Sequence, residues 1–252
     1  MSAVPSLVLW AWERPEDLRF LDPERAGVAF LAGTVTLGPE GMTFQPRMQP
    51  LRVSPQTKLV AVVRIETAAD GSLNPTGVLL AAGPGLDVAK AALYVGGAAL
   101  DSSLAGRVAA EIARAAEGPR VVAVQVDFDA TVSERTFYRE VLVELRRRLP
   151  AGMPISITAL ASWCIGDRWM ASLPVDEAVP MLFRMGAGRA EVSSFLRSGR
   201  DFPERVCRGS VGVSLDEPWR KLPAGRRVYV FSPGPWMKRS FQELPTEMRA
   251  AR

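Results

Sequence analysis

The most informative absence in this sequence is histidine, which does not occur once in 252 residues. Without an imidazole, the chain cannot form a Ser-His-Asp or Cys-His couple, and it cannot form a zinc site of the HExxH type. Only two cysteines are present, so a zinc cluster of cysteine and histidine ligands is excluded as well. Any acid–base chemistry must therefore use Asp, Glu, Tyr, Cys, Lys or Arg.

Long apolar runs are also missing. The longest run near the N-terminus, Leu7–Trp12, is followed at once by Glu13 and Arg14. It is too short for the hydrophobic core of a signal peptide and too short to span a membrane. We therefore expect a cytoplasmic protein as the chain stands, or an envelope or secreted protein if a leader is missing. Cys164 and Cys207 can pair, but two cysteines do not make a disulfide framework.

Neither sign of charge dominates the sequence, since 31 basic and 27 acidic residues leave a net charge of only +4. The basic residues are scattered, and the densest run, Arg146–Arg148, ends a predicted helix, where cations favour the helix dipole. We therefore expect no nucleic-acid partner. The composition, with 48% hydrophobic and 23% charged residues, is typical of a globular domain, and it leaves the oligomeric state open.

A recurring pattern of a short apolar run, turn residues and an amphipathic stretch predicts an α/β architecture with parallel strands. Eight runs predict strands: Leu7–Trp12, Gly27–Ala32, Lys58–Ile65, Val121–Asp127, Ile155–Ala161, Ala178–Phe183, Ser210–Leu215 and Val228–Phe231. Eight strands in this length favour a single (β/α)8 TIM-like barrel over a doubly wound sheet, and no GxGxxG loop opens a helix. We predict one barrel domain over residues 1–252.

The segments between these runs predict the helices of the barrel. Apolar spacing and end signals predict helices at Pro15–Leu21, Asp101–Ala116, Ser133–Leu149 and Ala187–Arg197. Ser133 is the expected N-cap of the longest one. Thr34–Gln45 has a turn-rich centre between two short β-like arms, and this predicts a small β-hairpin inserted after strand 2.

The fourth predicted strand carries the strongest chemical signal. In a parallel barrel the site lies at the carboxyl ends of the strands, and Gln125, Asp127 and Asp129 share one face there. Polar side chains on a buried strand are costly unless they are hydrogen-bonded or face a solvated cavity. Two neighbouring carboxylates also repel, so one of them can hold a proton, as glycosidic cleavage requires. Alternatively, Asp129 caps the next turn and Asp127 pairs with Arg64 or Arg184.

A second carboxylate is available at the same predicted rim. Asp216 and Glu217 follow the seventh strand and, with Asp127 and Asp129, complete the set of candidate catalytic residues. Glu66 is a further candidate, although it shares a face of the third strand with Arg64 and the two can simply pair with each other. A separation of about 5 Å between the two carboxyl groups would predict hydrolysis with retention of the anomeric configuration, and ~6.5–9.5 Å would predict inversion.

Aromatic residues gather at the same predicted strand ends. The flat faces of indole rings suit the apolar faces of sugars, and a concave mouth with convergent groups is typical of a binding site. The candidate substrate-binding residues are Trp10, Trp12, Arg64, Glu66, Gln125, Trp163, Arg184 and Trp236. Alternatively, each tryptophan only fills the core. Cys164 has no histidine to activate it, so we interpret it as a buried apolar residue.

Neither a metal nor another cofactor is required by this chemistry, and we expect none. A carboxylate-only magnesium or calcium site at Asp127 and Asp129 remains an alternative, but its spacing is unspecific.

Three motifs occur in order within residues 121–186: VQVDFDATVSERTFY, ISITALASWC and LPVDEAVPMLFRMG. This stretch resembles a bacterial family of uncharacterised proteins that is defined only as a domain of unknown function. The family is regarded as made of (β/α)8-barrel, glycoside-hydrolase-like proteins, so the resemblance implies that fold. It implies no particular activity.

A more distant likeness is to the chitinase-like barrels, whose fourth strand bears alternating acidic residues that end in a catalytic glutamate. Asp127 and Asp129 match the alternation, and Trp236 matches a tryptophan that floors the sugar site in that family. The position of the glutamate is occupied by Thr131, so the mechanism of that family is not transferable. We therefore expect a glycoside hydrolase-like barrel that acts on a polysaccharide or glycoside, or a non-catalytic carbohydrate-binding barrel.

Overall fold

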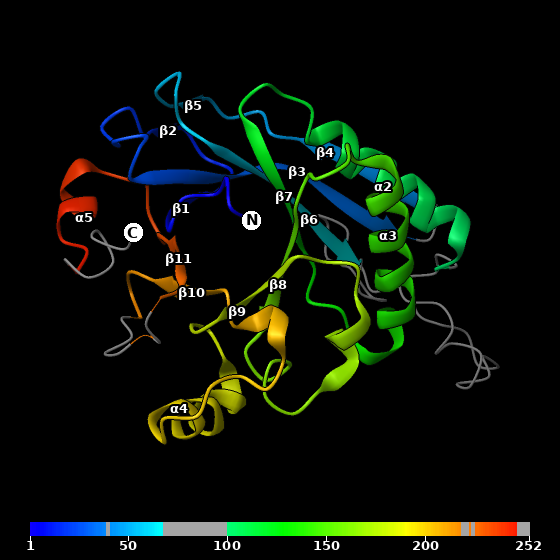
Figure 1. Cartoon of the computed structure of the whole chain (residues 1–252). Helices are drawn as coiled ribbons and strands as arrows, with labels where there is room; N and C mark the ends of the chain where they lie inside the picture. Colours follow the sequence, from blue (N-terminus) through cyan, green and yellow to red (C-terminus); the bar gives the residue numbers. More distant parts are fainter. Residues whose placement is uncertain (39–40, 68–99, 218–221, 223–224, 246–252) are drawn as a thin grey trace, which may run out of the picture.

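A closed barrel of parallel strands forms the centre of the protein (Figure 1). The computed structural model describes residues 1–38, 41–67, 100–217, 222 and 225–245. The barrel strands are β1 (Leu7–Ala11), β3 (Ala26–Gly38), β6 (Leu59–Thr67), β7 (Val121–Asp127), β8 (Ile155–Leu160), β9 (Glu177–Met181), β10 (Ser210–Ser214) and β11 (Arg227–Phe231). Each pairs in parallel with the next, and β1 pairs with both β3 and β11, which closes the ring. The predicted TIM-like barrel is confirmed, while its extent as one domain over residues 1–252 stays a prediction.

Helices cover the barrel unevenly. α2 (Ser102–Ala115) and α3 (Arg135–Arg148) lie side by side over β6, β7 and β8, whereas α4 (Arg189–Arg197) and α5 (Lys238–Gln242) are short (Figure 1). Three of the four predicted helices are confirmed. None of the described helices has both the length and the apolar character that crossing a membrane requires.

The start of α3 differs from the prediction. Ser133 lies within a 3-10 turn, Val132–Glu134, and the capping is done by Glu134. One oxygen of the Glu134 carboxylate accepts hydrogen bonds from the backbone N–H and the hydroxyl of Thr131, at 2.6 and 2.7 Å. This capping box holds the loop between β7 and α3 against the barrel.

The helix predicted at Pro15–Leu21 is wrong. The segment instead contains β2 (Glu16–Asp17), which pairs with β5 (Leu51–Arg52) in a small second sheet. The backbone N–H of Leu18 also donates to the carbonyl of Arg52, at 2.7 Å, and the Leu18 side chain is fully buried. Pairing with a distant segment therefore overrides the local helical pattern.

The predicted hairpin is present, but its first arm is the continuation of the second barrel strand. β3 pairs with β1 as far as Phe30, then bulges, and pairs from Gly33 with the returning strand β4 (Gly41–Pro46). A side chain at position 33 would meet the ring of Phe44, because a Cβ atom there would lie 2.4 Å from it. Glycine thus permits the bulge at which β3 leaves the barrel wall.

Arg47, just after β4, takes over the role of a strand partner for the end of β1. Its guanidinium donates to the carbonyl oxygens of Ala11, Trp12 and Arg14, at 3.3, 2.7 and 2.6 Å. Burial among these groups lowers the pKa of Arg47 from its usual value. The residues that follow β1 at the barrel mouth are therefore held in place.

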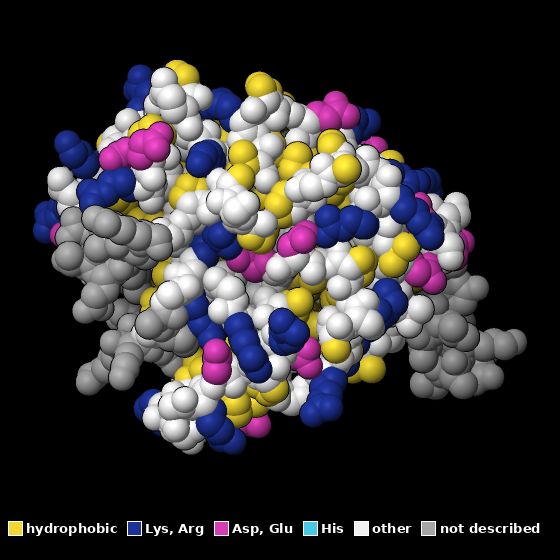
Figure 2. All heavy atoms as spheres, viewed as in Figure 1, with side chains coloured by type: hydrophobic (Ala, Val, Ile, Leu, Met, Phe, Trp, Pro, Cys, Tyr) yellow, Lys and Arg dark blue, Asp and Glu magenta, His cyan; other side chains and the backbone are white. Residues whose placement is uncertain are grey.

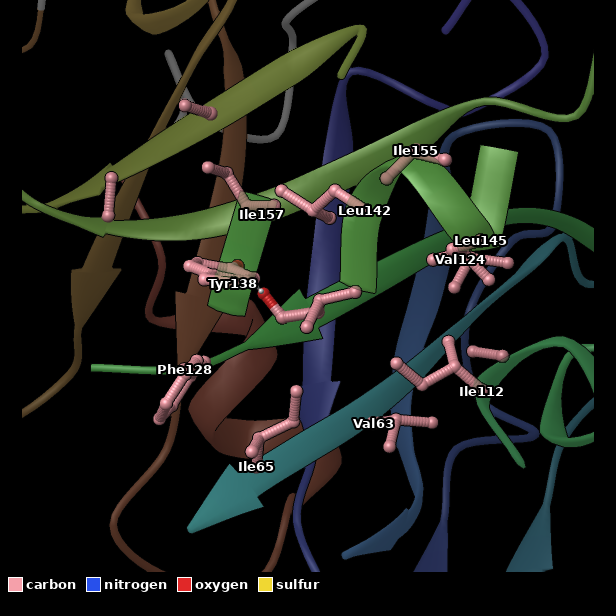
Figure 3. Close-up of a cluster of buried hydrophobic side chains, with 14 of the residues drawn as sticks. Val63, Ile65, Ile112, Val124, Phe128, Tyr138, Leu142, Leu145, Ile155 and Ile157 are labelled. Atoms are coloured by element: carbon pink, nitrogen blue, oxygen red, sulfur yellow. Dashed lines mark hydrogen bonds between the residues drawn. The ribbon is translucent and has the colours of Figure 1, made fainter. Parts of the chain in front are cut away.

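Two apolar layers stabilise the barrel, one outside the strands and one inside. In the outer layer, side chains of β6, β7 and β8 pack against α2 and α3 (Figure 3). The fully buried members of this layer include Ile112, Leu142, Leu145, Ile155 and Ile157. The inner layer contains Val8, Trp10, Ala29, Leu31, Val60, Val62, Ala123, Val179 and Tyr229.

A charged group lies inside the barrel below this inner layer. Glu177, at the start of β9, is 2% exposed and forms an ion pair with Arg227 of β11. Its carboxylate also accepts hydrogen bonds from the hydroxyls of Tyr229 and Ser156, at 2.9 and 3.2 Å. The buried charge is therefore fully compensated, as burial requires.

The side of the barrel with short helices is cross-linked by a disulfide between Cys164 and Cys207. Cys164 lies in the turn after β8, Cys207 ends the short 3-10 turn Arg205–Cys207, and both side chains are fully buried. The bond therefore ties the loop after β8 to the segment that leads into β10.

Candidate active site

The inner face of β7 leads from the barrel core to its mouth. Val124 and Val126 are buried in the outer layer, and Gln125 and Asp127 point to the inside, as the alternation predicts. Gln125 is fully buried, accepts a hydrogen bond from the indole N–H of Trp10 at 3.1 Å and donates to Ser156 at 3.0 Å. Gln125 therefore supports Trp10 from below.

Asp127 lies one step higher, where the strand ends. It is half-buried, and its carboxylate accepts a hydrogen bond from the hydroxyl of Thr158 on β8, at 2.7 Å. Burial raises the pKa of Asp127 to about 6, and repulsion from Asp129 and Glu66 adds to the rise. The Thr158 hydrogen bond and the charge of Arg64 oppose it. Asp127 can therefore exchange its proton near neutral pH.

Two more carboxylates stand beside Asp127. Asp129 and Glu66 are exposed, and both are close enough to influence the charge of Asp127. Glu66 pairs with Arg64 at 2.8 Å, and Arg64 lies opposite Asp127 in the register of β6 and β7. The structure therefore brings together Asp127, Asp129, Glu66 and Arg64, all predicted from the sequence.

Phe128, between the two aspartates, points the other way and is buried. Its ring meets that of Tyr138 of α3 edge-on, at a centroid distance of 5.1 Å (Figure 3). The Tyr138 hydroxyl is directed at the carbonyl of Val126, at 3.4 Å, and burial raises its pKa well above the usual value. This packing holds the end of β7 and keeps its aspartates directed towards the mouth.

Aromatic rings line the mouth on the side of β1, β9 and β11. Trp12 stacks on Trp10 with ring centroids 5.6 Å apart, and both meet Phe231, which in turn stacks on Phe183 at 5.4 Å. We call these four residues the aromatic floor. Trp10 and Phe183 are buried, with 4% and 8% of their surface exposed. Trp12 and Phe231 are the partly exposed members of the floor.

The carboxylates after β10 stand in a different environment. Asp216 is exposed, and a hydrogen bond from Ser214, together with the charge of Arg184, lowers its pKa. Glu217 accepts the backbone N–H of Arg184 at 3.2 Å and pairs with Arg189 at 2.8 Å. Both are engaged by groups of the protein itself.

Trp163 and Trp236 do not join the floor. A tight turn after β8 carries Trp163 into the outer apolar layer, where it meets Trp169 edge-on at 5.1 Å. Trp236 is also buried there, and its indole N–H donates to the carbonyl of Trp10 at 2.7 Å. The expectation that both line the mouth is not met, because the chain turns outward after each strand.

A small cavity of about 60 Å³ opens beside the floor, between the ends of β8 and β9. It is lined by Leu160, Ala161, Ser162, Met181, Phe183, Arg184, Met185, Gly188 and Val192. Met181 enters this region because position 212 on β10 has no side chain: a Cβ atom there would lie 2.6 Å from the Met181 sulfur. The lining is mostly apolar, with one cation at its edge.

Three residues of the site were not predicted as members: Thr158, Phe183 and Phe231. The signal for Thr158 was available, since alternation from Ser156 places it on the inner face of β8. Alternation from Tyr229 places Phe231 in the same way. Phe183 lies beyond the end of β9, where alternation no longer applies.

Acidic and basic side chains lie beside one another near the middle of the face shown in Figure 2. Among the described residues, no three carboxylate or thiol groups assemble in a way that could hold a metal ion. The arrangement offers a carboxyl group that titrates near neutral pH, neighbouring carboxylates and an aromatic surface. These groups can donate a proton and stabilise positive charge.

The chain has a distant similarity to a solved structure. The spore cortex-lytic enzyme SleL of Bacillus cereus matches over 84% of this chain and 51% of its own, with 16% sequence identity and a TM-score of 0.47. The chain thus spans about half the length of that solved structure, and the similarity assigns no role to any residue here. No family model and no curated protein matches the chain, so the resemblance to the family of unknown function stays a prediction.

Proposed function

We propose that this protein is a glycoside hydrolase-like barrel that acts on a polysaccharide or glycoside by carboxylate acid–base chemistry. The observation that carries the proposal is Asp127, a half-buried carboxyl group at the barrel mouth with a pKa of about 6. Such a group is protonated often enough near neutral pH to donate to a glycosidic oxygen as the bond breaks. The hydrogen bond from Thr158 reaches one oxygen of this carboxylate, and no residue in the described part of the chain donates to the other.

The second carboxylate comes from the same side of the mouth. Asp129 and Glu66 both influence the charge of Asp127, whereas Asp216 and Glu217 are engaged by Ser214, Arg184 and Arg189. In the proposed reaction, an ionised Asp129 or Glu66 stabilises the positive charge that develops on the sugar ring, or activates water. Product stereochemistry distinguishes these roles.

The aromatic floor supplies the surface on which a sugar ring would rest. Trp12 is partly exposed and is backed by Trp10 and by the edge of Phe231. The indole N–H of Trp10 is already used by Gln125, so this ring adds only apolar surface to the floor. Such a face suits the C–H side of a pyranose.

Hydrolysis of a panel of neutral and acidic oligosaccharides, followed by reducing-end release, tests this proposal. We expect Asp127→Asn to lower kcat/KM by about 10²–10⁴-fold on any substrate that is cleaved, the range for loss of a general acid. The matched control, Asp216→Asn, removes a carboxylate from the opposite side and should change the rate by only a few-fold. Equal activity of Asp127→Asn and the unmodified protein would refute the assignment.

One observation favours the second candidate function, a non-catalytic carbohydrate-binding barrel. Thr131, at the position of the glutamate in chitinase-like barrels, is tied to Glu134 in the capping box. This function predicts glycan binding without turnover, lost on Trp12→Ala and retained in Asp127→Asn. Calorimetric titration of both variants with the same panel separates the two functions.

We also propose that the protein works in an oxidising compartment. The support is the buried disulfide between Cys164 and Cys207, because structural disulfides persist outside the reducing cytosol. Denaturation of cells in acid, followed by alkylation with a maleimide polymer, is expected to leave both cysteines unlabelled unless a reductant is added before the alkylation. Labelling of both without a reductant would place the protein in a reducing compartment.

A further inference from the structure

Arg184 is held in a conformation that non-glycine residues rarely adopt. Its φ of 51° makes it the one non-glycine residue with a positive φ in the described part of the chain. Such a left-handed conformation is strained for an L-residue and needs support from its surroundings. The support is Glu217, whose two carboxylate oxygens lie 3.2 and 3.3 Å from the Arg184 backbone nitrogen, while Arg189 holds Glu217 from its other side.

This conformation carries the guanidinium to the edge of the aromatic floor. The Arg184 Cζ atom lies 5.7 Å from the ring centroid of Phe231, and the side chain is exposed. Across the mouth, the Cζ atom of Arg64 lies over the ring of Trp12, 5.2 Å from its centroid. The aromatic floor therefore has an arginine over a ring at each of two places.

The two arginines differ in their partners. Arg64 is neutralised by Glu66, at 2.8 Å, whereas Arg184 forms no salt bridge with any residue that the structure describes. Asp216 lies near enough to be influenced by Arg184, but it accepts a hydrogen bond from Ser214. Among the described residues, the Arg184 guanidinium thus has no bidentate carboxylate partner, and its planar set of donors suits an anion.

The small cavity between β8 and β9 lies directly beside these donors. Arg184 is on its edge, and Leu160, Met181, Met185 and Val192 contribute apolar side chains to its lining. A volume of about 60 Å³ suits a group of a few carbon atoms rather than a whole sugar ring. A ligand that fills both features has a negative charge and a short apolar group close together.

We propose that Arg184 and this cavity form a subsite for a carboxylate-bearing sugar residue, with the carboxylate on Arg184 and a short apolar substituent in the cavity. The inference rests on the proposed action on glycans and specifies its substrate class as acidic. On the opposite side of the mouth, Arg64 is already paired with Glu66, so Arg184 is the arginine of the floor that a ligand carboxylate would meet.

The test is calorimetric binding of matched oligosaccharide pairs, in which each O-acetylated uronic-acid oligomer is compared with its carboxyl-reduced neutral counterpart. We expect the protein to bind the acidic member about 10–100-fold more tightly, the range for charge-assisted hydrogen bonds. Arg184→Gly should abolish this preference, so that the acidic and the neutral member bind about equally. Because glycine accepts a positive φ without strain, the variant is expected to fold as well as the unmodified protein.

Arg197→Gln is the matched control, since Arg197 is exposed in the last turn of α4 and lies outside the cavity. It lowers the net charge by the same amount and should keep the preference for the acidic member. Equal binding of both members by the unmodified protein overturns the subsite and leaves the proposed function intact. Preference retained in Arg184→Gly also overturns it, and binding of no oligosaccharide overturns both.

Discussion

The two sides of the barrel mouth carry carboxylates in opposite conditions. On the side of β6 and β7, Asp127 is half-buried among other acids, and its pKa is raised. On the side of β10, Asp216 is exposed and bonded to Ser214, and its pKa is lowered. The same side-chain type is therefore set to hold a proton in one place and to stay charged in the other.

The layers behind the two sides differ as well. α2 and α3 cover β6 and β7 with a continuous apolar layer, so the end of β7 is held by packing. The loops after β8, β9 and β10 are joined instead by a disulfide and by arginine–carboxylate pairs. Glu217 and Asp201 on that second side thus serve as anchors for loops, and the proposed acid–base chemistry is placed on the first side.

The largest effect on stability is expected from a cavity in the apolar layer between α3 and the barrel. Leu142 of α3 is fully buried in the outer layer (Figure 3), so Leu142→Ala should lower the free energy of unfolding by about 2–5 kcal/mol. Urea unfolding followed by circular dichroism measures this loss. A change below about 1 kcal/mol would mean that the helices contribute little to holding β7.

The cross-linked side should respond to loss of its disulfide. The bond spans 43 residues of sequence, and replacing both Cys164 and Cys207 by alanine should cost about 2–4 kcal/mol of stability. Adding a reductant to the unmodified protein should lower its thermal midpoint in the same direction. The double variant is the control, because a reductant should leave its midpoint unchanged.

Opposite pH dependences should distinguish Asp127 from Asp216. The pKa of Asp127 is raised from 3.8 to about 6, so its stabilising protonation is complete below about pH 4 and is lost as the pH rises through 6. Relative to Asp127→Asn, the unmodified protein should lose about 1–3 kcal/mol over that interval. Relative to Asp216→Asn, it should lose stability as the pH falls, because the pKa of Asp216 is lowered. Parallel curves would contradict the comparison.

The smallest effect concerns Thr158, whose hydroxyl stabilises the charged form of Asp127. Thr158→Val removes this donor at nearly constant volume and should raise the pKa of Asp127 further, by roughly half a unit to one unit. Carboxyl carbon chemical shifts in an NMR titration report the change. Thr158→Ser keeps the hydroxyl and should restore the original pKa.

The strands and the face of β7 were predictable because they depend on local patterns. Runs such as Leu59–Ile65 are almost continuously apolar, as strands buried on both faces are, and alternation placed Asp127 on the inside. The helix α2 was equally clear from its apolar stripe. These features need no knowledge of distant segments.

The remaining features depend on partners far along the chain. The segment Pro15–Leu21 has a helical pattern, but its backbone pairs with residues 50–52. Trp163 and Trp236 follow strands as Trp12 does, yet the direction of each turn decides whether the ring meets the mouth or the outer layer. Likewise, the sequence contains several candidate carboxylates, and only their neighbours in space show that the pKa is raised at Asp127 and lowered at Asp216.

The contact between Gly212 and Met181 has a consequence for evolution. The methionine side chain occupies the space that any side chain at position 212 would need, and it forms part of the cavity wall. The two positions should therefore covary: a homologue with alanine at position 212 needs a smaller residue at position 181. Such compensated exchanges would alter the depth of the cavity while sparing the barrel, and so provide a simple route to new ligand preferences.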